Sequence, residues 1–304
     1  MKRDFLQITD FSSDEIREIF QLTTGMKKYT KLGQEYTPLK GKIMAMIFAK
    51  PSARTRISFE TGMVQLGGQA IYLSPTDIGL GTREATRDIA RVVSRYDDLI
   101  MARLFKHDDL LELAEYATVP VINGLTDLTH PCQVLSDIYT IWEHRKHLDN
   151  LKVAFIGDSN NVANSWLNLA TRLPMHFVLA TPTGYQPDAE ILKRARNTGI
   201  SRIEIVHNPQ EAVQSADVIY TDVWASMGQE ADLAKRRSDF NAFQVNGELL
   251  KYAPHDVYVM HCLPAHRGDE ITDEVIDGPN SIVFDQAENR LHVQKAIIVK
   301  LMQN

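Results

Sequence analysis

Short apolar runs alternate with stretches of helical periodicity along most of this chain. In the first half, the apolar runs that read as strands are Ile43–Phe48, Ala70–Leu73, Leu99–Leu104 and Val119–Ile122. Between them, apolar residues recur every three or four positions, which is the spacing of an amphipathic helix. These helical segments are Ile57–Leu66, Glu84–Tyr96 and Asp108–Tyr116. Regular alternation of this kind predicts a parallel sheet with helices on both faces.

The alternation returns after a polar stretch at residues 143–150. The strands expected there are Val153–Ile156, Phe177–Ala180, Ile203–Val206, Val218–Tyr220, Val257–Met260 and Ile282–Phe284. A closing helix is predicted over Ala287–Leu301. We therefore predict an α/β protein of two domains, residues 1–144 and 145–304, of which the second is Rossmann-like. The closing helix, about residues 287–303, is free in this scheme to pack back on the first domain.

Composition narrows the classes of function. A chain of 304 residues suits about two domains, and no apolar stretch approaches the roughly 20 residues that span a bilayer. The formal net charge of −6 disfavours a nucleic-acid or membrane-surface role, so an anionic ligand needs a local group of cations. Only two cysteines occur, Cys132 and Cys262, which suits a reducing compartment. We expect a cytoplasmic protein with no nucleic-acid or membrane partner.

The segment Ser52–Arg56, which reads S-A-R-T-R, lies where a strand ends and a helix begins. The free N–H groups and positive dipole end of that helix favour an anion. Arginine forks and hydroxyl groups supply further donors, so the segment is typical of a phosphate site without a glycine-rich loop. On its own it is equally compatible with a solvated turn whose serine or threonine caps the helix.

Two histidine-containing motifs follow predicted strands. The H-P-C-Q motif at 130–133 precedes a helical segment and places His130 and Gln133 at the carboxyl edge of the sheet, where ligands bind in open α/β folds. The H-C-L-P motif at 261–264 ends a strand, and its proline leaves the carbonyls of Cys262 and Leu263 without ladder partners. The alternatives are a histidine cap and an inert buried cysteine.

Further polar residues lie at expected sheet edges. Asp222 and Ser226 are four residues apart in D-V-W-A-S-M-G and could hold an amino group and a carboxylate, although an aspartate after a strand is also common turn chemistry. They open a long polar loop, Val223–Phe240, which suits either an active-site lid or a surface excursion. Arg103 and Arg290 would usually be interpreted as surface arginines. Beside the other motifs, they are additional cations at expected sheet edges.

Two kinds of cofactor are disfavoured. The stretch after Val153–Ile156 resembles the opening of a dinucleotide-binding domain but lacks G-x-G-x-x-G, so the backbone cannot approach a pyrophosphate in the usual way. The cysteine and histidine spacings match no standard zinc pattern. We predict neither a metal nor an organic cofactor.

Taken together, these motifs resemble the aspartate/ornithine transcarbamoylase family over nearly the whole chain. S-x-R-T-R and H-P-x-Q are shared by both branches of the family, whereas D-x-x-x-S-M-G and H-C-L-P resemble the ornithine branch. The resemblance implies transfer of a carbamoyl group from carbamoyl phosphate to the δ-amine of L-ornithine, giving citrulline and phosphate. It also implies a homotrimer or a multiple of one.

The resemblance implies a role for each motif residue. The ligands of carbamoyl phosphate would be Ser52, Ala53, Arg54, Thr55, Arg103, His130, Gln133, Cys262, Leu263 and Arg290. The ligands of ornithine would be Asn161, Asp222, Ser226 and Met227. The catalytic groups would be Arg103, His130, Cys262 and Asp222. Cys262 would assist deprotonation of ornithine, either as the proton acceptor or as a positioning group.

Two positions depart from the family pattern. Ala53 stands where threonine is frequent, and Gly79 stands where many members carry a glutamine that reaches carbamoyl phosphate from a neighbouring subunit. We expect weaker substrate binding with activity retained. Two rivals stay open, namely an amino-acid sensor that has lost catalysis and a transferase for putrescine or N-acetylornithine. The sequence fixes neither the metabolic direction nor the assembly size.

Overall fold

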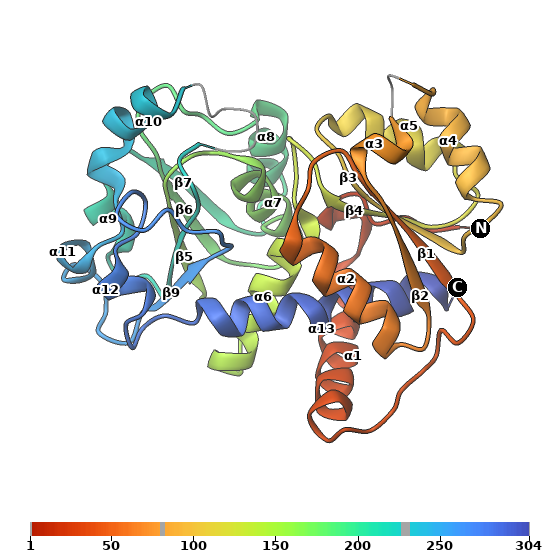
Figure 1. Ribbon diagram of the computed structural model, residues 1–304. Coiled ribbons are helices and arrows are strands. Elements are labelled where there is room, and N and C mark those ends of the chain that lie inside the picture. The colour runs from red at the N-terminus through yellow and green to blue at the C-terminus, as the bar shows by residue number, and fades with distance from the viewer. Residues whose placement is uncertain (1, 80–82, 226–231, 304) are drawn as a thin grey trace. The chain divides into compact units, whose positions relative to one another are not determined.

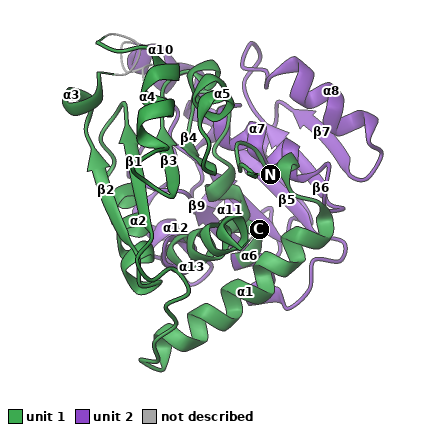
Figure 2. Ribbon diagram, turned by 90° about the vertical axis from the view of Figure 1, so that its right-hand side faces the viewer, with its two compact units in different colours: residues 1–139, 289–304 green, residues 140–288 purple. Residues whose placement is uncertain are grey.

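The computed structural model describes residues 2–79, 83–225 and 232–303 (Figure 1). It divides into two compact units, one formed by residues 1–139 and 289–304 and the other by residues 140–288 (Figure 2). The divisions fall within two helices, α6 (Pro131–Arg145) and α13 (Val283–Met302). The C-terminal part of the chain therefore returns to the first unit.

The first unit is built on a four-stranded parallel sheet in the order β2-β1-β3-β4. Its strands are β1 (Ile43–Phe48), β2 (Gln69–Leu73), β3 (Leu99–Arg103) and β4 (Val121–Leu125). Its helices include α1 (Ser13–Lys31), α2 (Ala53–Gln65), α3 (Pro75–Ile78), α4 (Thr86–Val93) and α5 (His107–Tyr116). Helices α4 and α5 pack on one face of the sheet, and α1 and α2 lie on the other (Figure 1).

The second unit carries a five-stranded parallel sheet in the order β7-β6-β5-β8-β9. Its strands are β5 (Lys152–Ile156), β6 (His176–Ala180), β7 (Arg202–Val206), β8 (Val218–Thr221) and β9 (Tyr258–His261). Its helices include α7 (Asn161–Leu169), α8 (Ala189–Asn197), α9 (Pro209–Val213), α10 (Leu233–Phe240), α11 (Gly247–Leu250) and α12 (Asp273–Ile276). The strand order reverses between β5 and β8, as in a Rossmann fold. The predicted fold class is confirmed.

Three predicted elements need correction. Ile282–Phe284 is not a strand, because the run lies at the start of α13 and only a single bridge joins Ser281 to Val259. Ile282 and Val283 are buried at the start of that helix, whereas Phe284 is 64% exposed. The second half of the predicted loop Val223–Phe240 is helix α10. Strand β4 begins two residues later than predicted, since Pro120 has no N–H for the ladder.

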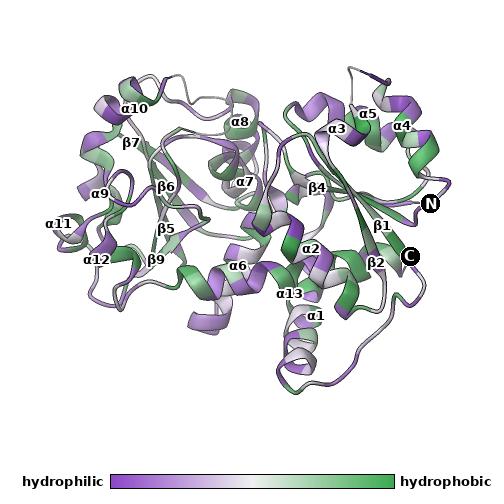
Figure 3. Cartoon of the chain, in the orientation of Figure 1, coloured by the Kyte–Doolittle hydropathy of each residue, from purple (hydrophilic) through white to green (hydrophobic). Residues whose placement is uncertain are grey.

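The apolar residues concentrate in the sheets and on the inward sides of the helices (Figure 3). Strand β1 is buried over five of its six residues, as its continuous apolar sequence requires. Within the described part of the chain, no helix combines the length and the apolar character that crossing a membrane would need.

Candidate active site

Three residues of the first unit converge on the hydroxyl oxygen of a fourth. Thr55 Oγ1 accepts hydrogen bonds from Ser52 Oγ at 3.1 Å, from Arg103 Nη1 at 3.3 Å and from Arg290 Nη2 at 3.3 Å. A hydroxyl oxygen has two lone pairs, so three donors exceed what it can accept. The guanidinium groups of Arg103 and Arg290 therefore lie beside one neutral oxygen. The arrangement has the donors and the charge to hold a phosphate.

The helix that carries these residues begins earlier than the sequence pattern predicts. Helix α2 starts at Ala53 with Ser52 as its N-cap, so the motif forms its first turn. The backbone N–H groups of this turn, including that of Ala53, have no partner within the helix. Arg54 is exposed and makes no hydrogen bond or ion pair with another described residue. Its guanidinium is therefore available to a ligand at the helix N-terminus.

Arg56, the second arginine of the motif, serves the fold. Its Nε donates to Glu60 at 3.0 Å, and its guanidinium lies 4.1 Å from the centroid of the Tyr72 ring. The motif thus divides into ligand-facing residues and one structural arginine. The sequence pattern alone did not separate the two arginines.

His130 lies just before α6 and is only 5% exposed. Burial, with additional repulsion from the Arg290 and Arg103 charges, holds the pKa of its imidazole well below the usual 6.5. The ring is therefore neutral at physiological pH. A neutral ring with a positioned N–H is suited to donate a hydrogen bond to a carbonyl oxygen without supplying a full charge.

Gln133, in the first turn of α6, presents a buried carbonyl oxygen. Its Nε2 donates to Asp137 Oδ1 at 2.8 Å, which fixes the orientation of the amide because a carboxylate accepts only from the NH2 end. Its Oε1 is buried and has no hydrogen-bond partner among the described residues. That oxygen is an acceptor suited to an NH2 group.

The second unit gathers a separate polar cluster at the ends of β8 and β9. Asp222, directly after β8, accepts from Cys262 Sγ at 2.8 Å through Oδ1 and from Asn160 Nδ2 at 2.7 Å through Oδ2. Asn160 is also the N-cap of α7, since its Oδ1 accepts from Val162 N at 2.9 Å. Asn160 was not predicted as a site residue. Its capping position before an apolar helix was the available signal.

A buried histidine and glutamate shape the loop after β9. His261 Nε2 lies 3.0 Å from Glu270 Oε1, and both side chains are fully buried. His261 Nδ1 accepts from the Leu263 N–H at 2.8 Å, which places the ring proton on Nε2. Leu263 adopts a φ of +55°, a left-handed conformation that is uncommon for leucine. The pair thus holds Cys262 and Leu263 in an unusual backbone turn.

Glu270 lies nine residues after His261 and belongs to no motif, so sequence reasoning missed it. It also accepts from the backbone N–H of His266 at 2.6 Å. The carbonyl of Leu263, which was predicted to bind ligand, accepts no hydrogen bond from a described residue.

The remaining predicted residues are placed as follows. Asn161 is the first residue of α7, next to Asn160, and its backbone carbonyl accepts from Ser165 Oγ at 2.8 Å. Ser226 and Met227 lie outside the described residues. Gly79 has a φ of +53°, and a Cβ there would lie 2.6 Å from Arg83 Cβ. The local backbone therefore requires glycine at this position.

The thiol, imidazole and carboxylate of Cys262, His261 and Asp222 form the one metal-like group in the described ranges, with ligand atoms within 4.8 Å of one another. These donors match zinc in chemical type. Both imidazole nitrogens, however, already have partners in Glu270 and the Leu263 N–H. A metal would have to displace the contact that shapes the Leu263 turn.

An arginine in α10 anchors the segment predicted as a lid. Arg236 Nη1 donates to Asp158 Oδ2 at 2.9 Å and to the Trp224 carbonyl at 2.7 Å. Burial raises the pKa of Asp158, and the Arg236 charge opposes that shift. The contact fixes α10 at the carboxyl end of β5.

Two family models match successive parts of the chain. Residues 3–143 match the carbamoyl-P binding domain of aspartate/ornithine carbamoyltransferase, and residues 149–301 match the Asp/Orn binding domain of the same family. The chain belongs to the aspartate/ornithine carbamoyltransferase family.

Individual members of this family are similar over almost the full length. The chain is 54% identical to the chloroplastic ornithine carbamoyltransferase of Pisum sativum, covering 99% of this chain and 80% of that protein. It is 52% identical to the anabolic ornithine carbamoyltransferase of Pyrococcus furiosus, covering 99% and 96%. A solved Pyrococcus furiosus structure superposes with a TM-score of 0.96 at 51% identity, covering 100% of this chain and 98% of that one. The Thermus thermophilus structure gives 0.89 at 42% identity, covering 99% of each chain.

Proposed function

We propose that this protein is an ornithine carbamoyltransferase, which transfers the carbamoyl group of carbamoyl phosphate to the δ-amine of L-ornithine in arginine metabolism. The observation that carries the proposal is the convergence of Ser52, Arg103 and Arg290 on Thr55 at the N-terminus of α2. Relatives that share half of the sequence over its full length are named as ornithine carbamoyltransferases. The domain matches support the two substrates.

The first unit binds carbamoyl phosphate in this proposal. Its phosphate is held by Ser52, Arg54, Thr55, Arg290 and the backbone N–H of Ala53. The buried Oε1 of Gln133 accepts from the carbamoyl NH2, because it is an acceptor that no described residue uses. The family resemblance, not the geometry, assigns the carbonyls of Cys262 and Leu263 in the second unit to the same substrate.

Arg103 and His130 donate to the carbamoyl oxygen. Attack by an amine builds negative charge on that oxygen, so donors fixed before the reaction lower the barrier. Loss of one such donor typically costs about 2.7–4 kcal/mol of barrier. The neutral state of His130 makes it a hydrogen-bond donor here, not a general acid of ordinary strength.

The second unit binds ornithine through Asp222, Asn161, Ser226 and Met227. The δ-ammonium has a pKa of about 10 in water and must lose a proton before it can attack. The amine nitrogen then bonds to the carbamoyl carbon, and the bond from that carbon to the phosphate oxygen breaks with its electron pair. The second nitrogen proton leaves with the phosphate or solvent. The Asp222–Cys262 pair at 2.8 Å supports a role for both groups in the first deprotonation.

The domain assignment follows the same division. Residues 1–144 form the carbamoyl-phosphate domain and residues 145–304 the ornithine domain, with the closing helix contributing Arg290 to the first. The contact of Arg290 with Thr55 supports this return of the closing helix. We propose no metal and no organic cofactor for the reaction.

We also propose a homotrimer, or a multiple of one. The surface of the first unit supports a subunit contact, because Ile57 on α2 is 63% exposed and Ile71 on the edge strand β2 is 46% exposed. Apolar side chains beside an open sheet edge favour association. Light scattering after size exclusion should give about three times 34.4 kDa, or a multiple. Ile57→Asp should shift the protein to smaller species, and a monomeric parent would contradict the proposal.

A cytoplasmic location completes the proposal. Both cysteines are free, with Cys132 buried and Cys262 half-buried, which suits a reducing compartment. Fractionation of the native cells with immunodetection tests the location.

Citrulline formation tests the activity. The purified protein with carbamoyl phosphate and L-ornithine should release citrulline and phosphate in equal amounts. Ligand binding without product would instead favour the amino-acid sensor, in which the Ala53 and Gly79 departures have abolished catalysis.

A further inference from the structure

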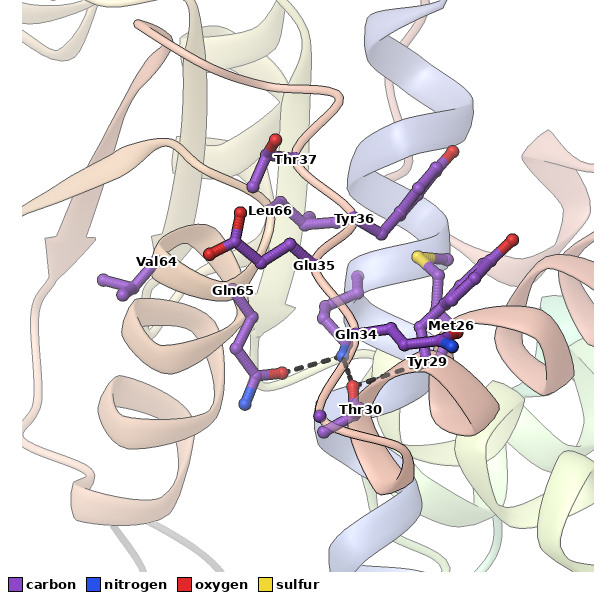
Figure 4. A pocket seen from close by; sticks show the side chains of 12 residues that line it. Met26, Tyr29, Thr30, Gln34, Glu35, Tyr36, Thr37, Val64, Gln65 and Leu66 are labelled. Carbon is purple, nitrogen blue, oxygen red and sulfur yellow. Dashed lines mark hydrogen bonds between the residues drawn. The ribbon is translucent and has the colours of Figure 1, made fainter.

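The first unit contains a cavity that no residue of the proposed reaction lines. Its volume is about 340 Å³, and it lies between the end of α1, the segment 33–37, the last turn of α2 and the closing helix (Figure 4). The residues that decide its chemistry are Tyr29, Thr30, Glu35, Tyr36, Gln65 and Lys295. A cavity of this size is in the range that takes a small organic molecule.

The cavity contains a buried ammonium group without a carboxylate partner. Lys295 is 2% exposed, and its Nζ donates to Gln65 Oε1 at 2.7 Å and to Thr30 Oγ1 at 2.9 Å. An ammonium has three hydrogens, whereas the described residues supply two neutral acceptors. Burial lowers the pKa of Lys295 to about 8. An anion in the cavity would stabilise the charged form.

The lysine is held by its surroundings. Its stem passes Gly62 on α2, where a Cβ would lie 3.3 Å from Lys295 Cγ. Gln65 uses Oε1 for Lys295, so the other end of its amide presents N–H donors. Lys295 and Gln65 together therefore offer donors from two elements to one acceptor group, the pattern that a carboxylate fits.

The other residues that line the cavity restrict the part of a ligand that lies beyond its carboxylate. The rings of Tyr29 and Tyr36 stack with centroids 5.6 Å apart and an interplanar angle of 9°, which provides a flat apolar surface. Glu35 is the acidic residue of the lining, and it is exposed. Its charge disfavours a multiply charged anion more than a singly charged one. An aromatic or aliphatic body with a single carboxylate meets both conditions.

We propose that this cavity is a binding site for a small organic monocarboxylate, whose carboxylate is held by Lys295 and Gln65 and whose apolar body packs against Tyr29 and Tyr36. The site is separate from the Thr55 cluster and independent of the proposed transfer reaction. Bound carboxylate raises the pKa of Lys295, so binding near pH 8 takes up a proton.

Titration calorimetry with benzoate tests the site in the full-length protein. Benzoate should bind to the parent at least ten times more tightly than benzamide, its neutral counterpart, or inorganic phosphate. Lys295→Met should weaken benzoate binding at least tenfold. Lys28→Met removes one exposed positive charge from α1 outside the cavity lining and should leave the affinity unchanged.

Proton uptake gives a readout that a structural role of Lys295 would not move. Buffers of different ionisation enthalpy should reveal uptake of up to about half a proton near pH 8, and almost none at pH 6, where the lysine is already charged. Gln65→Leu keeps the lysine and should weaken benzoate binding, which covers the case that Lys295→Met does not fold. No benzoate binding at tens of millimolar, equal affinity in the Lys295 or Gln65 variant, or binding without proton uptake would overturn the proposal.

Discussion

Arg54 and Arg56 stand two residues apart in one helical turn but have different surroundings. Arg54 is exposed and makes no hydrogen bond or ion pair with another described residue, whereas Arg56 is paired with Glu60 and stacked on Tyr72. If the N-terminus of α2 binds phosphate, only the first arginine should matter for catalysis. The pair therefore offers a matched comparison within one motif.

Arg54→Ala should lower kcat/KM for carbamoyl phosphate by about 100-fold or more, since it removes a charge-assisted contact to the leaving phosphate. Its free energy of unfolding should stay within about 0.5 kcal/mol of the parent, as is usual for an exposed side chain. Arg56→Ala should keep kcat/KM within a few-fold. Steady-state kinetics with urea unfolding check both, and near-normal turnover in Arg54→Ala would refute the phosphate assignment.

His130 makes stability depend on pH in a direction that the structure fixes. The folded state holds the imidazole neutral, whereas the unfolded chain protonates it near pH 6.5. Unfolding below that pH therefore takes up a proton, and the free energy of unfolding falls as the pH falls, by at most about 1.4 kcal/mol per pH unit for this group. His130→Gln should reduce the slope between pH 6.5 and 5 in urea titrations. An unchanged slope would mean that the ring is not buried in its neutral form.

Among individual residues, the motifs predicted most members of the polar cluster around Thr55 but not the hydrogen bonds between them. Ser52, Arg103 and Arg290 come together on the hydroxyl oxygen of Thr55. Glu270 could not be predicted, because its role depends on a buried contact with His261 that exists only once β9 and its following loop are folded.

Among the helices and strands, two helix N-termini position residues of the candidate active site. Helix α2 carries the phosphate motif in its first turn, and α7 begins at Asn161 with Asn160 as its cap. Asn160 has two roles, because its Oδ1 caps the helix and its Nδ2 donates to Asp222.

Substitutions at Asn160 should separate these two tasks. Asn160→Ser keeps a capping oxygen but loses the donor to Asp222, so KM for ornithine should rise several-fold with little loss of stability. Asn160→Ala should raise this KM similarly and also lower the free energy of unfolding by about 1 kcal/mol. Steady-state kinetics and urea unfolding of both variants distinguish them. Parent-like ornithine KM in both would show that Asp222 does not depend on Asn160.

Hydrophobic periodicity predicted the strands and helices well where the buried positions of an element follow its regular repeat. It failed at Ile282–Phe284, because a short apolar run looks the same in a strand and at the start of a helix. It also missed α10, whose exposed and charged sequence gives little amphipathic signal; packing of Phe240 and the Arg236 contacts hold it instead.

At the scale of the whole molecule, local charge prevails over net charge. The chain carries a formal charge of −6, yet Arg103 and Arg290 gather beside Thr55 from positions 187 residues apart, 290 − 103, in the sequence. Composition could not predict this concentration, because it depends on the return of the closing helix to the first unit. The family motifs could predict it, since they marked Arg103 and Arg290 as ligands of the same anion, carbamoyl phosphate.

Selectivity among amines distinguishes an ornithine carbamoyltransferase from the other transferases. With saturating carbamoyl phosphate, kcat/KM should be compared for L-ornithine, N-acetylornithine, putrescine and L-aspartate by measuring phosphate release and the carbamoylated product. L-Ornithine should be preferred at least 100-fold, because a site that pairs both the amino group and the carboxylate rejects amines that leave those partners unsatisfied. Equal or faster turnover of putrescine or N-acetylornithine would contradict it.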